Sequence, residues 1–98
     1  RDSSLTNRKL ALNALEKFDP SEKILEVFKT AALNDPSPHI RAQSINYLGN
    51  CEDSKNNVRQ VLAAVFVRDS SGTVKDAARA ALDKLKQAEA KVGQNSGE

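Results

Sequence analysis

The segment that runs from Asp35 to Leu48 recurs 34 positions later, and this repetition constrains the fold more than any other feature of the sequence. Each copy is a turn followed by a short amphipathic helix. The matched pairs are Asp35 and Asp69, Ile40 and Val74, Arg41 and Lys75, Ser44 and Ala78, and Leu48 and Leu82. A partial third copy lies 33 positions upstream, at Asp2, Arg8, Ala11 and Leu15. Self-similarity at a fixed period of about 20–50 residues is typical of stacked structural repeats.

The helices that precede these segments repeat as well. The apolar residues of the first of them lie at Ile24, Val27, Phe28, Ala31 and Ala32, and those of the second lie 34 positions later, at Val58, Val61, Leu62, Val65 and Phe66. The repeated unit is therefore a pair of helices. We expect an all-α chain of five antiparallel helices, about two and a half repeats, stacked as an α-α superhelix.

Turn signals and helical periodicity place these helices at about 4–18, 21–33, 37–48, 55–67 and 73–90. Leu5, Leu10, Ala11, Ala14, Leu15 and Phe18 are predicted to form the apolar stripe of the first helix. The repeat domain is predicted to span 1–88. Residues 89–98 are expected to be a frayed helix end followed by a disordered polar tail.

Composition excludes several classes of function. Charged residues of both signs are interspersed and the formal net charge is +2, so the clustered basic surface of a nucleic-acid-binding protein is not expected. No apolar run of 18 residues occurs, so no membrane insertion is expected. With four aromatic residues in 98, the core must consist mainly of Leu, Val, Ile and Ala.

No set of residues indicates catalysis, a metal or a cofactor. His39 is the single histidine and is expected in an exposed turn, and Cys51 is the single cysteine. One residue of each kind provides neither a triad nor a convergent ligand set. Ser70-Ser71-Gly72 lacks the lysine and the preceding strand of a phosphate-binding loop. The fragment itself is therefore predicted not to be an enzyme, and Tyr47 is expected to be a packing residue.

The pattern Asp-Pro-x-x-x-Ile/Val-Arg/Lys-x-x-Ala/Ser-x-x-x-Leu resembles the second helix of a HEAT repeat. Asp35, Pro36, Ile40, Arg41, Ser44 and Leu48 carry it, and Asp69, Val74, Lys75, Ala78 and Leu82 carry it again. The resemblance covers about residues 2–86. The first copy departs from it at Asn7, where the family has Ile or Val, and the unit is short for the family.

The resemblance implies roles for two sets of residues. The aspartate and the basic residue of each unit would form a structural ladder between neighbouring repeats, built from Asp2, Arg8, Asp35, Arg41, Asp69 and Lys75. Exposed pairs of this kind each contribute about 0.2–1 kcal/mol. A protein partner would bind the surface formed by the second helices, whose outward positions are Lys9, Asn13, Ala42, Asn46, Asp76, Arg79 and Asp83.

Two functions remain open at this stage. The first is a non-catalytic scaffold that mediates protein–protein interaction. The alternative is the C-terminal helical domain of a larger enzyme, for example a zinc aminopeptidase, that supports or covers the catalytic domain. The sequence begins with Arg1 and contains no methionine, so a piece of a larger protein is expected. Its compartment is left open, with the cytoplasm slightly favoured.

Overall fold

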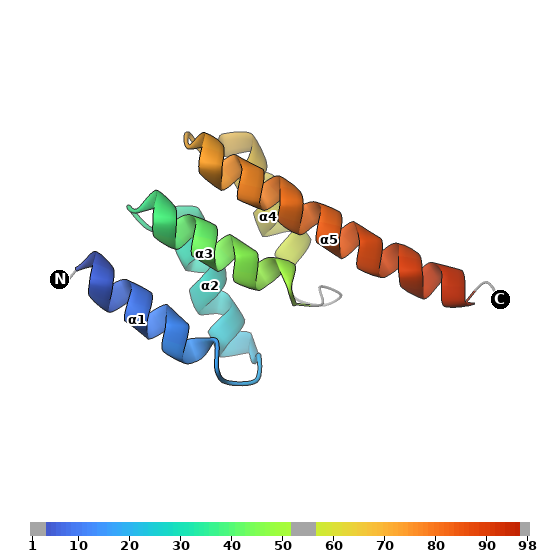
Figure 1. The fold of residues 1–98 in the computed structure, drawn as a ribbon, viewed down its shortest axis with the longest axis horizontal. Coiled ribbons are helices and arrows are strands. Elements are labelled where there is room, and N and C mark those ends of the chain that lie inside the picture. The colour runs from blue at the N-terminus through green and yellow to red at the C-terminus, as the bar shows by residue number, and fades with distance from the viewer. Residues whose placement is uncertain (1–3, 52–56, 97–98) are drawn as a thin grey trace.

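The computed structural model describes residues 4–51 and 57–96, and over these residues the ordered elements are all helices (Figure 1). The all-α expectation is thus confirmed. The helices are α1 (Leu5–Leu15), α2 (Glu22–Asn34), α3 (Pro38–Gly49), α4 (Val58–Arg68) and α5 (Gly72–Ser96).

The helices form two layers. α1, α3 and α5 lie side by side, and α2 and α4 lie behind them (Figure 1). α3 is the centre of the arrangement, because it packs against α2 and α5 and also contacts α1. α2 and α4 also contact each other, so the two pairs α2–α3 and α4–α5 stack as neighbouring units.

The N-termini of four helices are fixed by serine hydroxyls. Ser4 Oγ accepts a hydrogen bond from the backbone N–H of Asn7, and Ser21 Oγ accepts one from Ile24. Ser37 and Ser71 act in the same way ahead of α3 and α5. Each hydroxyl satisfies one of the backbone donors that a helix start leaves without a partner. The corresponding residue ahead of α4 is Asn57, which has a left-handed backbone (φ 57°) and makes no side-chain cap hydrogen bond.

The core contains equivalent positions from successive units. Phe28 and its equivalent Leu62 are fully buried, as are Ile40 and its equivalent Val74. The remaining buried apolar residues are Leu12, Leu25, Ala32, Ile45, Leu48, Val58, Val65, Ala78, Ala81 and Leu85. Each helix therefore contributes an apolar face to one continuous cluster.

The α3–α5 contact is closer than side chains usually allow. A Cβ atom placed on Gly49 would lie 2.7 Å from the Cβ of Ala81. Glycine is needed here because it lets the two backbones approach, and not for an unusual dihedral angle, since no glycine among the described residues has a positive φ.

Three helix boundaries differ from the sequence-based expectation. α1 ends at Leu15 and not near 18, because its last turn tightens: the N–H groups of Lys17 and Phe18 bond to carbonyls three residues back. α4 begins at Val58 and not near 55, although residues 52–56 lie outside the described part. α5 continues to Ser96, through most of residues 89–98, which were expected to be a frayed helix end and a disordered tail. Residues 86–92 are mostly strong helix formers, and one internal glycine costs only about 1 kcal/mol.

The predicted apolar stripe of α1 is wrong in its detail. Leu12, which the stripe omits, is the buried residue of this helix. Leu10 and Phe18 are 59% and 62% exposed. The reason is that α1 packs mainly against α3, so only the side of α1 that faces α3 is covered.

Candidate interaction surface

Two arginines of the front layer each hold an aspartate of the next unit. Arg8 Nε and Nη2 donate to Asp35 Oδ2 and Oδ1 at 2.9 and 3.0 Å. Arg41 Nε and Nη2 donate to Asp69 Oδ2 and Oδ1 at 2.8 and 3.1 Å. Both pairs have the two-pronged geometry in which guanidinium and carboxylate match best. The two contacts therefore connect three successive units in the same way.

Each aspartate also fixes the turn in which it lies. Asp35 Oδ1 accepts the N–H of Ser37 at 2.9 Å, and Asp69 Oδ1 accepts the N–H of Ser71 at 2.9 Å. Arg41 Nη1 donates to the backbone carbonyl of Asp35 at 2.8 Å. Arg41 thus joins its own turn to the following one.

These pairs are more buried than the sequence-based expectation of exposed pairs. The side chains of Asp35 and Asp69 are 9% and 7% exposed, and Arg41 is 14% exposed. Burial by itself would raise the pKa of Asp69, but the hydrogen bonds from Arg41 and Ser71 outweigh it, so that the pKa lies below its ordinary value. A carboxylate in this setting contributes more than a surface pair does.

Two members of the expected ladder, Asp2 and Lys75, are not part of these two Arg–Asp pairs. Asp2 lies outside the described residues. Lys75 occupies the position of Arg8 and Arg41 on α5, and its charge helps to lower the pKa of Asp69. The pairing runs from the arginine of one unit to the aspartate of the next, so Lys75 is the last basic residue of the row.

A hollow of about 350 Å³ opens on the front layer along α3, with Lys9 of α1 on one side and Thr73 of α5 on the other. Its lining combines amides, hydroxyls, one amine, one imidazole and small apolar groups: Lys9, Pro38, His39, Ala42, Gln43, Asn46, Ser71 and Thr73. Gln43 Nε2 also donates to Asn13 Oδ1 at 2.8 Å and to Glu16 Oε2 at 3.3 Å. The hollow therefore offers hydrogen-bond donors and acceptors to a ligand that crosses the three helices.

The structure brings together part of the face expected from the sequence. Lys9, Ala42 and Asn46 line the hollow, and Asn13 borders it through Gln43. Asp76, Arg79 and Asp83 are exposed on α5 but do not line it.

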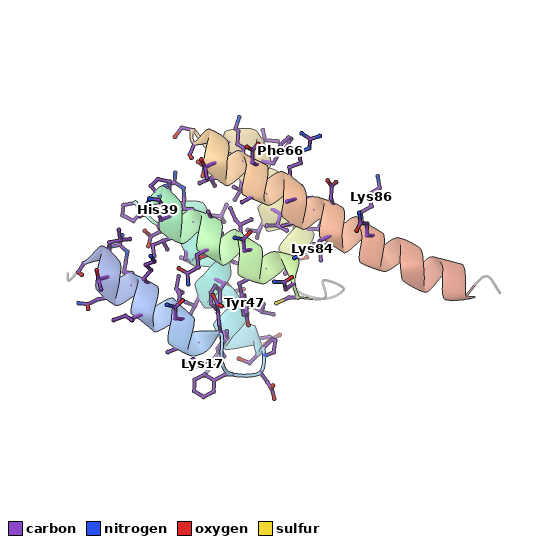
Figure 2. The ribbon with its side chains drawn as sticks, viewed as in Figure 1. Lys17, His39, Tyr47, Phe66, Lys84 and Lys86 are labelled. Carbon is purple, nitrogen blue, oxygen red and sulfur yellow. The ribbon has the colours of Figure 1, made fainter. Side chains whose placement is uncertain are left out.

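Sequence reasoning missed several lining residues. His39 was expected in a turn, but it is the second residue of α3 and lies at the N-terminal end of that helix (Figure 2). Gln43 was not among the outward positions expected from the sequence. Ser71 was assigned to the turn before the fifth helix, and Thr73 to the start of that helix.

Two buried hydroxyl groups, those of Tyr47 and Ser44, lie within the packing of α3. The ring of Tyr47 stacks on Phe28 of α2, with ring centroids 3.8 Å apart and an angle of 15° between the planes. Tyr47 lies near the C-terminal end of α1 (Figure 2). Its hydroxyl and that of Ser44 are buried and have no hydrogen-bond partner among the described residues. Burial raises the pKa of Tyr47 and also that of Cys51, whose Sγ donates to the carbonyl of Tyr47. Both groups therefore stay neutral, which suits packing.

Neither a metal centre nor a membrane span emerges from the described residues. No group of three or more His, Cys, Asp or Glu side chains converges there. No helix in the same part of the chain is long and apolar enough to cross a membrane.

Comparison with known proteins gives one match. The model of the family described as HEAT repeats matches residues 1–83. No curated protein and no solved structure matched the chain. The family match covers most of the sequence and contains both stacked units and the Arg–Asp pairs between them, so the chain belongs to the HEAT repeat family.

Proposed function

We propose that this chain is a non-catalytic scaffold segment that binds a protein partner across its front layer of α1, α3 and α5. The hollow of about 350 Å³ on that layer carries the proposal. It lies at the small end of the range for ligand sites, which is about 300–1,000 Å³. A hollow of this size accommodates a few side chains of a bound segment and not a whole domain.

The chemistry of the lining supports a peptide as the bound segment. Asn46 presents an amide, which can pair with the N–H and C=O groups of a peptide backbone, whereas Gln43 Nε2 already donates to Asn13 and Glu16. Ala42 and Pro38 provide apolar surface within the same hollow. Lys9 is exposed at the α1 side, so an acidic side chain of the partner is favoured there.

The experiment is a selection of short random peptides displayed on phage against residues 1–98. Selected peptides are then compared on an Ala42→Arg variant, in which a long charged side chain occupies the hollow. The matched control is Ala64→Arg, because Ala64 is half-buried like Ala42 and lies on α4, which does not line the hollow. We expect Ala42→Arg to weaken binding about tenfold or more and Ala64→Arg to leave it within about twofold.

A second variant tests the charge preference. Lys9→Glu should remove the preference for acidic peptides without changing the melting temperature, since Lys9 is exposed. Peptides that bind the wild-type and Ala42→Arg proteins equally well would contradict the proposal.

A further inference from the structure

The outer side of α5 carries charged side chains of alternating sign. They are spaced at intervals of three or four residues, so they lie on one face of the helix. Together with one small residue they form what we call the outer stripe, whose members are all exposed: Asp76, Arg79, Ala80, Asp83 and Lys86. None of the four charged side chains makes an ion pair within the described part of the chain. The outer stripe therefore presents its charges to whatever packs against it.

The internal repeat shows that the outer stripe takes the place of a buried face. Ile45 of α3 is fully buried, and its equivalent on α5 is Arg79. Gly49, which lets α5 approach α3, corresponds to Asp83. A further helix that packed on α5 as α5 packs on α3 would have to bury both charges without partners, which is costly. The outer stripe therefore disfavours a further unit in the same orientation.

The order of the charges matches a second copy of the same helix that runs in the opposite direction. When two antiparallel copies of α5 are level at Ala81, Asp76 of one copy lies opposite Lys86 of the other, and Arg79 lies opposite Asp83. In an interface with two-fold symmetry each of these contacts occurs twice. Every charge of the outer stripe then lies opposite a charge of the other sign.

Other arrangements of the same two helices do not match. A parallel pair in register places each charge opposite its own copy. Sliding one antiparallel helix by three residues places Asp76 opposite Asp83 in one direction and Arg79 opposite Lys86 in the other. Such juxtaposed like charges oppose association. We infer that two copies of this chain associate through the outer stripes of α5, antiparallel and level at Ala81.

The length of α5 and the apolar end of α4 fit this arrangement. α5 continues past Leu85, the last buried residue among the described side chains, to Ser96, and it extends beyond α3 and α4 (Figure 1). At the other end of α5, Phe66 and Val67 of α4 are 41% and 72% exposed. Phe66 lies beside the first turns of α5 (Figure 2). In the antiparallel pair, the extension of one copy is level with those first turns in the other, where it covers apolar surface.

The interface does not depend on the function proposed above. No residue of the outer stripe lines the front hollow. A dimer therefore presents two front hollows, and a partner that carries two binding segments gains affinity by engaging both.

The first test is sedimentation velocity of residues 1–98 over a concentration series from about 10 µM to about 1 mM, the range of weak complexes. We expect a concentration-dependent dimer. Arg79→Glu and Asp83→Arg each place like charges opposite each other, so each should weaken the dimer about tenfold or more. The double variant restores opposite charges at this contact, so its dissociation constant should return to within about threefold of the wild-type value.

The matched control is Lys23→Glu, because it makes the same change in net charge as Arg79→Glu at an exposed position of α2. It should leave the dissociation constant within about twofold. The melting temperature of each variant at low concentration checks that it folds, and little change is expected because all three positions are exposed. Ala42→Arg should dimerise like the wild type, which separates the outer stripe from the front hollow.

The second test determines the orientation of the two helices. A nitroxide is attached to a Gln87→Cys, Cys51→Ser variant, because Gln87 is exposed and is not part of the outer stripe. This variant is mixed with an isotopically labelled wild-type copy. In the antiparallel pair Gln87 is level with Lys75 of the other copy, so the NMR signals around Lys75 should broaden most.

Three results would overturn the inference. One is a chain that stays monomeric up to about 1 mM. Another is a double variant that dimerises as weakly as Arg79→Glu alone, because the charges would then not face each other. The third is strongest broadening around Gln87 itself, which would show a parallel pair.

Discussion

Replacement of Asp69 by alanine tests how strongly the units are held together. The carboxylate accepts two hydrogen bonds from Arg41 and one from the N–H of Ser71, at 2.8, 3.1 and 2.9 Å. Its side chain is 7% exposed. Hydrogen bonds to charged groups contribute about 1.5–3 kcal/mol each, and they do not add fully when they share one group. The expected loss is therefore about 2–4 kcal/mol of the free energy of unfolding, against about 0.2–1 kcal/mol for an exposed pair.

The assay is urea unfolding followed by far-UV circular dichroism for the wild type, Asp69→Ala, Arg41→Ala and the double variant. The double-mutant cycle isolates the interaction between the two side chains, which we expect to be about 1–3 kcal/mol. Asp69→Asn keeps the shape and the acceptor for Ser71, so it should cost less than Asp69→Ala. A loss below about 1 kcal/mol for Asp69→Ala, with an interaction energy near zero, would refute the argument from burial.

Three further results follow from the same structure. The pKa of Asp69 is lowered in the folded protein. Its contribution to the free energy of unfolding is therefore present above the unfolded pKa of about 3.9 and is lost as the pH falls through the folded value. The difference in free energy of unfolding between wild type and Asp69→Asn should shrink when urea titrations are repeated in acid. Gly49→Ala places a Cβ 2.7 Å from that of Ala81, so unfolding should require about 1–2 kcal/mol less despite better helix propensity, and adding Ala81→Gly should recover part of the loss. Tyr47→Phe removes a buried hydroxyl without a partner among the described residues and should raise the free energy of unfolding by about 1 kcal/mol. A clear decrease in the free energy of unfolding would show that the hydroxyl has a partner.

The sequence predicted the architecture because the repeat supplies two independent signals. The period of 34 residues identifies the unit, and the helical spacing of apolar residues identifies the buried faces. Ile40 and Val74 were matched by the period and are both fully buried. Agreement between the two signals made the five helices predictable to within a few residues at most ends.

The errors concentrate where helices lack neighbours. Periodicity cannot say which side of α1 is covered when α3 is its main neighbour, and so Leu10 was included and Leu12 omitted. The extent of α5 was underestimated for a different reason, since the helix propensity of residues 86–92 favours continuation of the helix beyond the expected end.

The candidate surface was only partly predictable. Outward positions follow from the register, which is how Lys9, Ala42 and Asn46 were found. The hollow itself depends on the angle and spacing of three helices, and Gly49 permits the close approach of two of them, α3 and α5. The burial of the Asp35 and Asp69 carboxylates depends on the same close stacking, and the sequence pattern contains no measure of it.

The stacking of the units is the central claim of this account, and the contact between Gly49 and Ala81 tests it most directly. A carbon-edited NOE spectrum of residues 1–98 should show a strong cross-peak between the Ala81 methyl group and the Gly49 α-protons, because an ideal Cβ on Gly49 would lie 2.7 Å from that methyl carbon. If the Ala81 methyl group showed contacts to α4 but none to Gly49, α3 and α5 would not be neighbours in this register, and both the Arg41–Asp69 contact and the front hollow would have to be abandoned.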